Sequence, residues 1–176
     1  MINELFAKLP KATSFQVTST DVKDGQPFAI DQFSGISGVK YGKDLSPQLS
    51  WSGAPEGTKS YAVTVYDPDA PTGSGFWHWA VANIPATVNE LKTGAGDDKG
   101  LELPKGAIQL QNDASIARFM GAAPPHGHGK HRYLMVIHAL DIEDIGVTIN
   151  ATPAALGFQM FSHTLGRAVL TATAEL

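Results

Sequence analysis

The sequence predicts a mainly β protein, an antiparallel β-sandwich-like single domain over residues 1–176 with a few peripheral helices. The length of 176 residues suits one domain with a sizeable core. The 18 Gly and 11 Pro are spread along the chain, as many tight turns between short elements would require. Strand-like segments follow one another with too few helices between them for parallel βαβ units.

Short alternating or β-branched segments define the expected strands. Residues 14–22 alternate apolar and polar side chains, the pattern of a strand with one buried face. Residues 76–84 are rich in aromatic side chains, and residues 131–142 are apolar enough for a central strand. Residues 86–106 are polar and Gly-rich, so we expect a loop there. The expected strands are 14–22, 27–30, 47–51, 59–67, 76–84, 107–113, 131–142 and 168–176.

Two segments have the patterns of helices. Residues 2–9 carry apolar side chains at helical spacing and are followed by Pro10, which ends the helix. Residues 152–166 are also expected to be helical, because Thr152 can cap the first turn and Pro153 suits the first helical position.

Composition excludes several classes of function. The net charge is −4 and no run of Lys or Arg occurs, so we expect no nucleic-acid partner. The chain has no Cys, which excludes disulfides, thiolate nucleophiles and Cys-zinc sites. No segment approaches the roughly 20 apolar residues of a membrane span, and the N-terminus lacks the pattern of a signal peptide. We therefore expect no stable membrane insertion and a cytoplasmic location.

Two apolar segments could take part in a homodimer. They are the expected helix at residues 2–9 and the region Met160–Phe161. Burial of the same side chains in the core of one chain is the other interpretation.

The stretch YDPDAPTGSGFWHWAVANIP places polar groups beside expected core. Its prolines fix the backbone, so the loop can hold Asp67 and Asp69 in set directions, or these side chains can cap the turn. Alternation along the next strand sends His78 to one face and Trp77 and Trp79 to the other. His78 is then either a satisfied buried residue or a pocket residue held by a carboxylate.

A second polar stretch, PPHGHGKHRY, contains His126, His128 and His131. Its HGH resembles the His-x-His motif of the cupins, but no acidic residue follows before Asp141, so we expect neither a metal site nor a cofactor. Catalytic residues are not expected either, because there is no Cys and no G-x-S-x-G elbow. The two Asp of the first stretch are too close in sequence to flank a bond from opposite sides.

Together, YDPDAP, the following HW and GAAPPHGHGKHRY resemble the phosphatidylethanolamine-binding protein family, also called Raf kinase inhibitor proteins. The bacterial branch is the most similar, and the resemblance covers most of residues 14–174. It implies a β-sandwich-like fold with a small pocket for phosphate, phosphorylated headgroups or similar anions. Some eukaryotic members inhibit kinases or proteases. Transferred by position, the ligand-binding residues are Asp67, Asp69, His78, Gly121, Ala123, Pro125, His131 and Tyr133.

The expected function is therefore that of a non-enzymatic binding protein for small phosphate-bearing groups, with a target kinase or protease as a further partner. Two carboxylates would repel an anion. Protonated His78 and His131, with Tyr133 as a hydrogen-bond donor, could offset them, or the ligand could be a zwitterion such as an ethanolamine headgroup. The alternatives are a hydrolase of small phosphate esters that uses Asp67, Asp69 and His78 for acid–base chemistry, and a protease or kinase inhibitor that acts through its surface.

Overall fold

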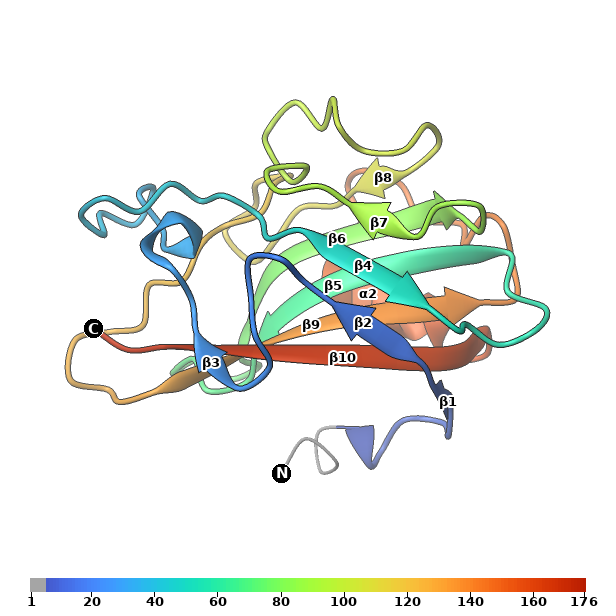
Figure 1. The fold of residues 1–176 in the computed structure, drawn as a ribbon, viewed down its shortest axis with the longest axis horizontal. Coiled ribbons are helices and arrows are strands. Elements are labelled where there is room, and N and C mark those ends of the chain that lie inside the picture. The colour runs from blue at the N-terminus through green and yellow to red at the C-terminus, as the bar shows by residue number, and fades with distance from the viewer. Residues whose placement is uncertain (1–5) are drawn as a thin grey trace.

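The computed structural model describes residues 6–176, in which the strands form a seven-stranded sheet and a three-stranded sheet (Figure 1). The order in the large sheet is β1-β10-β9-β5-β6-β8, with β3 also paired to β10, and the order in the small sheet is β2-β4-β7. The strands are β1 (Thr13–Ser14), β2 (Gln16–Thr18), β3 (Gln26–Pro27), β4 (Leu49–Ser52), β5 (Ser60–Asp67), β6 (Phe76–Pro85), β7 (Glu90–Leu91), β8 (Ile108–Gln109), β9 (His131–Leu140) and β10 (Thr164–Ala174). The helices are the 3-10 helix η1 (Ile30–Gln32) and the α-helix α2 (Pro153–Met160). The predicted mainly β fold is confirmed.

Each of the four long strands β10, β9, β5 and β6 is antiparallel to its neighbours in this order, whereas the short strands β1 and β3 run parallel to β10 at its outer edge. The small sheet covers one face of the large one (Figure 1). Between them lies the main core, in which Leu49 and Trp51 of the small sheet face Val63, Trp79 and Ile137 of the large sheet. Burial of these large side chains between two sheets is the principal source of stability for such a sandwich.

Helix α2 lies on the opposite face of the large sheet (Figure 1). The sheet presents small side chains there, Ala62, Ala80 and Ala82, against Leu156 and Met160 of the helix. Small residues on the sheet let a helix approach closely, and this second core is correspondingly smaller than the first. None of the helices in residues 6–176 is long and apolar enough to cross a membrane.

The expected C-terminal helix is shorter than predicted. Its start is confirmed, because the Thr152 side chain accepts a hydrogen bond from the backbone N–H of Ala155 at 3.1 Å. The helix ends at Met160 instead of residue 166, because the chain from Thr164 onward pairs with β9 as the start of β10. Pairing with a neighbouring strand therefore overrides the local helical pattern.

Other boundaries also differ from the expected ones. The expected loop 86–106 contains the short strand β7, and the expected strands 14–22 and 107–113 shrink to short pieces. Half of the expected helix at residues 2–9 lies outside the described residues, which begin at residue 6. Within the described part, the backbone N–H of Leu9 donates to the carbonyl of Phe6 at 3.0 Å.

A β-bulge in β6 separates the two Trp residues that flank His78. Val65 of β5 pairs with Trp79 and Tyr66 pairs with Trp77, so His78 has no partner on β5. Trp79 is fully buried between the sheets, whereas Trp77 lies on the outer face, with its ring 4.4 Å from that of Tyr66. The prediction that both Trp share one face was wrong, because strand alternation fails at a bulge.

Candidate functional site

A cavity of about 190 Å³ lies where the C-terminal end of β5 meets the N-terminal ends of β6 and β9. The structure brings seven of the eight predicted ligand-binding residues into its wall, all except Asp69. The lining residues are Ser37, Asp67, Ala70, Pro71, Thr72, Phe76, His78, Met120, Gly121, Ala123, Pro124, Pro125, His131 and Tyr133. Within residues 6–176 no three His, Asp or Glu side chains are grouped so that they could hold a metal ion.

The carboxylate of Asp67 is buried and fully engaged. One oxygen accepts from the backbone N–H groups of Asp69 and Ala70, at 2.8 and 3.1 Å, which is the hydrogen-bond pattern of an Asx turn. The other oxygen accepts from Nδ1 of His131 at 2.7 Å. Both side chains are only 2–3% exposed. Three donors thus surround Asp67, so it orients the loop and the imidazole in place of presenting a bare charge.

His131 connects this buried carboxylate to the surface. Because its Nδ1 donates to Asp67, Nε2 is the acceptor in a neutral ring, and it lies 2.8 Å from Nδ1 of His128. His128 is exposed on the loop before β9. The sequence did not assign a role to His128, and the structure shows that it extends the Asp67–His131 pair to solvent.

His78 enters the cavity from the bulge in β6. Its Nδ1 donates to the carbonyl of Met120 at 2.8 Å, and its ring lies 5.0 Å from that of Tyr133 in an edge-on arrangement. Burial lowers the pKa of His78, and the bond to Met120 only partly opposes this effect. Burial, with Asp67 as a second cause, raises the pKa of Tyr133 far above its usual range. Both side chains are therefore neutral near pH 7 in the free protein.

The backbone of residues 120–122 forms the wall opposite the Asp67 loop. The N–H of Met120 donates to the carbonyl of His78 at 3.0 Å, and the N–H of Gly121 donates to the buried carboxylate of Asp44 at 2.8 Å. A Cβ on Gly121 would lie 2.4 Å from the carbonyl carbon of Phe33, so this position has no room for a side chain. Close packing against the backbone of Phe33 thus explains why residue 121 is a glycine.

Asp69 differs from its predicted position. It does not line the cavity, and its carboxylate accepts from Nε and Nη2 of Arg132, at 2.8 and 2.7 Å, and from the backbone N–H of the same residue at 2.8 Å. The Arg132 side chain is the main reason that the pKa of Asp69 is lowered. Asp69 therefore fastens the loop to β9 from behind the cavity.

Sequence reasoning missed several members of the wall. Phe76 and Met120 lie next to residues that were identified, and Met120 directly precedes the predicted Gly121. Ser37 comes from a Gly-rich loop thirty residues before Asp67, and nothing in its local sequence distinguishes it from an ordinary turn residue. All described peptide bonds are trans, including those that precede the prolines of the Asp67 loop.

Comparisons with known proteins agree on one family. The family model described as phosphatidylethanolamine-binding protein matches residues 18–175. The chain is 48% identical over 167 residues to the UPF0098 protein YbcL of Escherichia coli K12, with 94% of this chain and 90% of YbcL aligned. It is 43% identical over 158 residues to YbhB of the same organism, with 89% and 98% aligned. The crystal structure of YbcL, described as a new member of the mammalian PEBP family, superposes with a TM-score of 0.88 at 47% identity, covering 93% of this chain and 99% of that chain.

Substitution of Gly121 by Ala should destabilise the protein. The added Cβ meets the backbone of Phe33, which cannot move away as a side-chain tip could. We expect a loss of about 1–3 kcal/mol in the free energy of unfolding, measured by urea denaturation. Gly157→Ala is the matched control, since no atom lies within 4 Å of its Cβ and the site is helical, so this variant should be as stable as the parent or more stable. Equal stability of Gly121→Ala and the parent would contradict the close-packing explanation.

Substitution of Asp69 by Asn should loosen the loop in a pH-dependent way. We expect a loss of about 1–2 kcal/mol at pH 7, because a charged acceptor of three hydrogen bonds is replaced by a neutral group. The pKa of Asp69 is lowered in the folded state, so its contribution is complete above the unfolded pKa and is lost as the pH falls through the folded pKa. The stability difference between the two proteins should therefore shrink below about pH 4.

The control for this experiment is Glu102→Gln, which removes an exposed ion pair with Lys92. Such pairs contribute little, so this variant should stay within about 0.5 kcal/mol of the parent at every pH. If Asp69→Asn behaves like Glu102→Gln, the loop does not depend on the Arg132 contact.

Proposed function

The chain belongs to the phosphatidylethanolamine-binding protein family, as its sequence motifs predicted, and on that premise we propose that its cavity binds a small phosphate-bearing group without altering it chemically. The observation that carries the proposal is the convergence of His78, His131 and Tyr133 with the engaged carboxylate of Asp67 around one small space. Family membership alone supports a binding protein, and the contacts in this cavity support the chemical class of its ligand.

The size of the cavity favours a headgroup over a whole lipid. Its volume of about 190 Å³ is below the range of about 300–1,000 Å³ that is typical of sites for larger small molecules. A phosphate with a short substituent such as ethanolamine fits that space, whereas acyl chains do not. A lipid ligand would therefore leave its chains outside the cavity.

The hydrogen bonds around Asp67 reduce the repulsion that two carboxylates would exert on an anion. Asp69 is paired with Arg132 behind the wall, and Asp67 is paired with His131 and two backbone donors. His78 is neutral before the ligand binds, and an anion beside it favours its protonated form. Binding of an anion should therefore be accompanied by uptake of a proton.

The hydroxyl groups of the lining favour binding over turnover. Ser37 shares a hydrogen bond with Ser34, at 3.2 Å between the two Oγ atoms, and Thr72 donates to the carbonyl of Gly75. Within residues 6–176 neither hydroxyl contacts a histidine that could activate it as a nucleophile. Inhibition of a target kinase or protease, a homodimer and a cytoplasmic location stay predictions from the sequence.

Calorimetric titration tests the proposed ligand class. Inorganic phosphate and phosphoethanolamine should each bind the parent saturably at one site, and His78→Ala should weaken both by about tenfold or more through the loss of one charge-assisted hydrogen bond. His163→Ala is the matched control, because this partly exposed His pairs with Asp141 and does not line the cavity. Absence of binding to the parent, or steady release of product from small phosphate esters that His78→Ala abolishes, would refute the proposal.

The pH dependence of anion binding tests the role of His78. Sulfate keeps its charge between pH 8 and 6, so any change in its affinity reports on the protein. We expect sulfate to bind more tightly as the pH falls, by at most about tenfold per pH unit for a single proton, because the anion raises the lowered pKa of His78. The affinity of His78→Gln should change less with pH. An unchanged pH profile in that variant would show that His78 is not the group that takes up the proton.

A further inference from the structure

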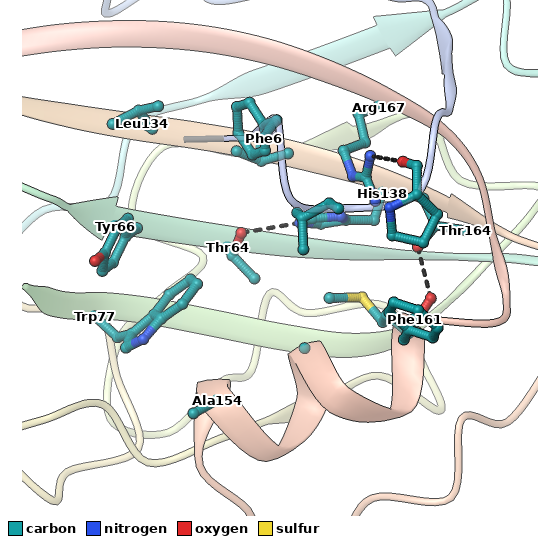
Figure 2. A pocket seen from close by; sticks show the side chains of 15 residues that line it. Phe6, Thr64, Tyr66, Trp77, Leu134, His138, Ala154, Phe161, Thr164 and Arg167 are labelled. Carbon is teal, nitrogen blue, oxygen red and sulfur yellow. Dashed lines mark hydrogen bonds between the residues drawn. The ribbon is translucent and has the colours of Figure 1, made fainter. Parts of the chain in front are cut away.

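A second, larger cavity of about 310 Å³ lies on the outer face of the large sheet, beneath helix α2 (Figure 2). Its floor comes from β5, β6 and β9, and its walls come from α2 and from residues of the N-terminal segment 6–10. Most of the lining is apolar. The volume is within the range of about 300–1,000 Å³ that is typical of small-molecule sites, and none of the residues predicted to bind the phosphate group takes part.

Among the described residues, the cavity is lined by one cation for which no counter-charge is present. Arg167 is the only charged side chain of the described lining, and no carboxylate within residues 6–176 pairs with it. Its Nη1 donates to the carbonyl of Pro10 at 2.8 Å, while its Nε is buried and has no partner. Arg132 provides the contrast, since its Nε and Nη2 together bind the carboxylate of Asp69. Within residues 6–176, the same side of the Arg167 guanidinium has no such acceptor.

His138 lies beside Arg167 but adds no charge of its own. Its Nε2 is 3.1 Å from Oγ1 of Thr64, and its Nδ1 is buried without a partner. Burial lowers the pKa of His138 to about 3, with Arg167 as a second cause, so the ring is neutral at physiological pH. This end of the cavity is therefore net positive, and two buried nitrogens, one on each residue, have no hydrogen-bond partner within residues 6–176.

The other end of the cavity is apolar. Figure 2 shows Tyr66, Trp77 and Leu134 at the end opposite Arg167 and His138. Leu134 and His138 are four residues apart on β9, a distance of about 14 Å at roughly 3.4 Å per residue. The cavity is thus elongated, with a cation at one end and aromatic rings at the other.

We propose that this cavity binds an amphipathic monocarboxylate, a medium-chain fatty acid or an aromatic acid of similar length. The carboxylate would accept hydrogen bonds from Arg167, and the chain would lie along the sheet toward Trp77. A neutral apolar ligand would leave the Arg167 charge uncompensated, and a ligand with more than one charge would bury an unpaired group against the apolar walls. This site is independent of the proposed phosphate site, although adjacent residues of β5 and β6 line the two cavities.

Titration with octanoate, and with octanol as a neutral ligand of the same length, tests the proposal by calorimetry. Octanoate should bind the parent at one site, and octanol should bind more weakly by about ten- to hundred-fold, the effect of one charge-assisted contact. Arg167→Gln should reduce octanoate affinity by the same factor and leave octanol affinity unchanged. Thermal unfolding of this variant checks that it is folded.

Gly157→Leu is a second variant, and its result does not depend on whether Arg167→Gln is folded. Gly157 lies on the cavity side of α2, and a Cβ placed there meets no atom within 4 Å, so the Leu side chain should fill the cavity and abolish binding of both ligands. Phosphate affinity at the other site should not change in either variant.

Three results would overturn the proposal. They are no octanoate binding to the parent, equal affinity for octanoate and octanol, and undiminished octanoate binding in folded Arg167→Gln. Sedimentation velocity tests the alternative that a second copy of the chain occupies the cavity. If the protein is a dimer that Gly157→Leu dissociates and octanoate leaves intact, a second copy occupies this cavity and not a carboxylate ligand.

Discussion

The bulge at His78, one of two register shifts between β5 and β6, sets which side chains of β6 reach each cavity. Because His78 has no partner on β5, the strand gains one residue and the side chains on either side of the bulge change face. Trp79 remains in the core between the sheets, Trp77 turns to the outer face, and His78 enters the cavity at the strand ends. A regular strand would place Trp77 and Trp79 on the same face. The bulge thus places His78 and Trp79 on the inner side of the strand together, while Trp77 lines the cavity on the outer face.

The charged groups near the two cavities differ in how they are compensated. Asp67 and Asp69 each accept three hydrogen bonds from the protein, so the loop that carries them is held rigidly before any ligand arrives. In the part of the chain that the structure describes, Arg167 instead has one carbonyl acceptor and an unpaired Nε. Buried polar groups in folded proteins are generally paired, and an exception calls for a specific explanation. For Arg167 the explanation that we favour is a ligand that supplies the missing acceptor.

The sequence predicted the parts of the fold in which side-chain pattern alone decides the structure. The strands β5 and β9 are rich in apolar and β-branched residues, and their predicted positions agree with the structure. Prediction failed where pairing with a segment distant in sequence decides the secondary structure. The residues from Thr164 to Gly166 fit a helix locally but pair with β9, and the strand β7 lies in a Gly-rich stretch that has no strand pattern.

In the candidate site, too, local motifs were predictable and contacts between distant segments were not. Its members were found through two motifs, but an Asp next to Pro looks the same in sequence whether it faces a cavity or an arginine. The bond between Asp69 and Arg132 therefore could not be predicted, and neither could the contribution of Ser37 from a remote loop. The bulge at His78 has no signature in the sequence FWHWAV, which fits a regular strand equally well.

The position of each cavity in the fold explains the kind of ligand that we assign to it. The first lies where strands end and loops begin, so two imidazoles, a tyrosine and a carboxylate converge there, and a compact polar group can be bound from several sides. The second lies over the middle of the sheet, where backbone groups are used in strand pairing and only side chains reach the ligand. Those side chains are apolar except at the end near Arg167. A ligand that satisfies the second cavity must therefore be mostly apolar and carry its charge at one end.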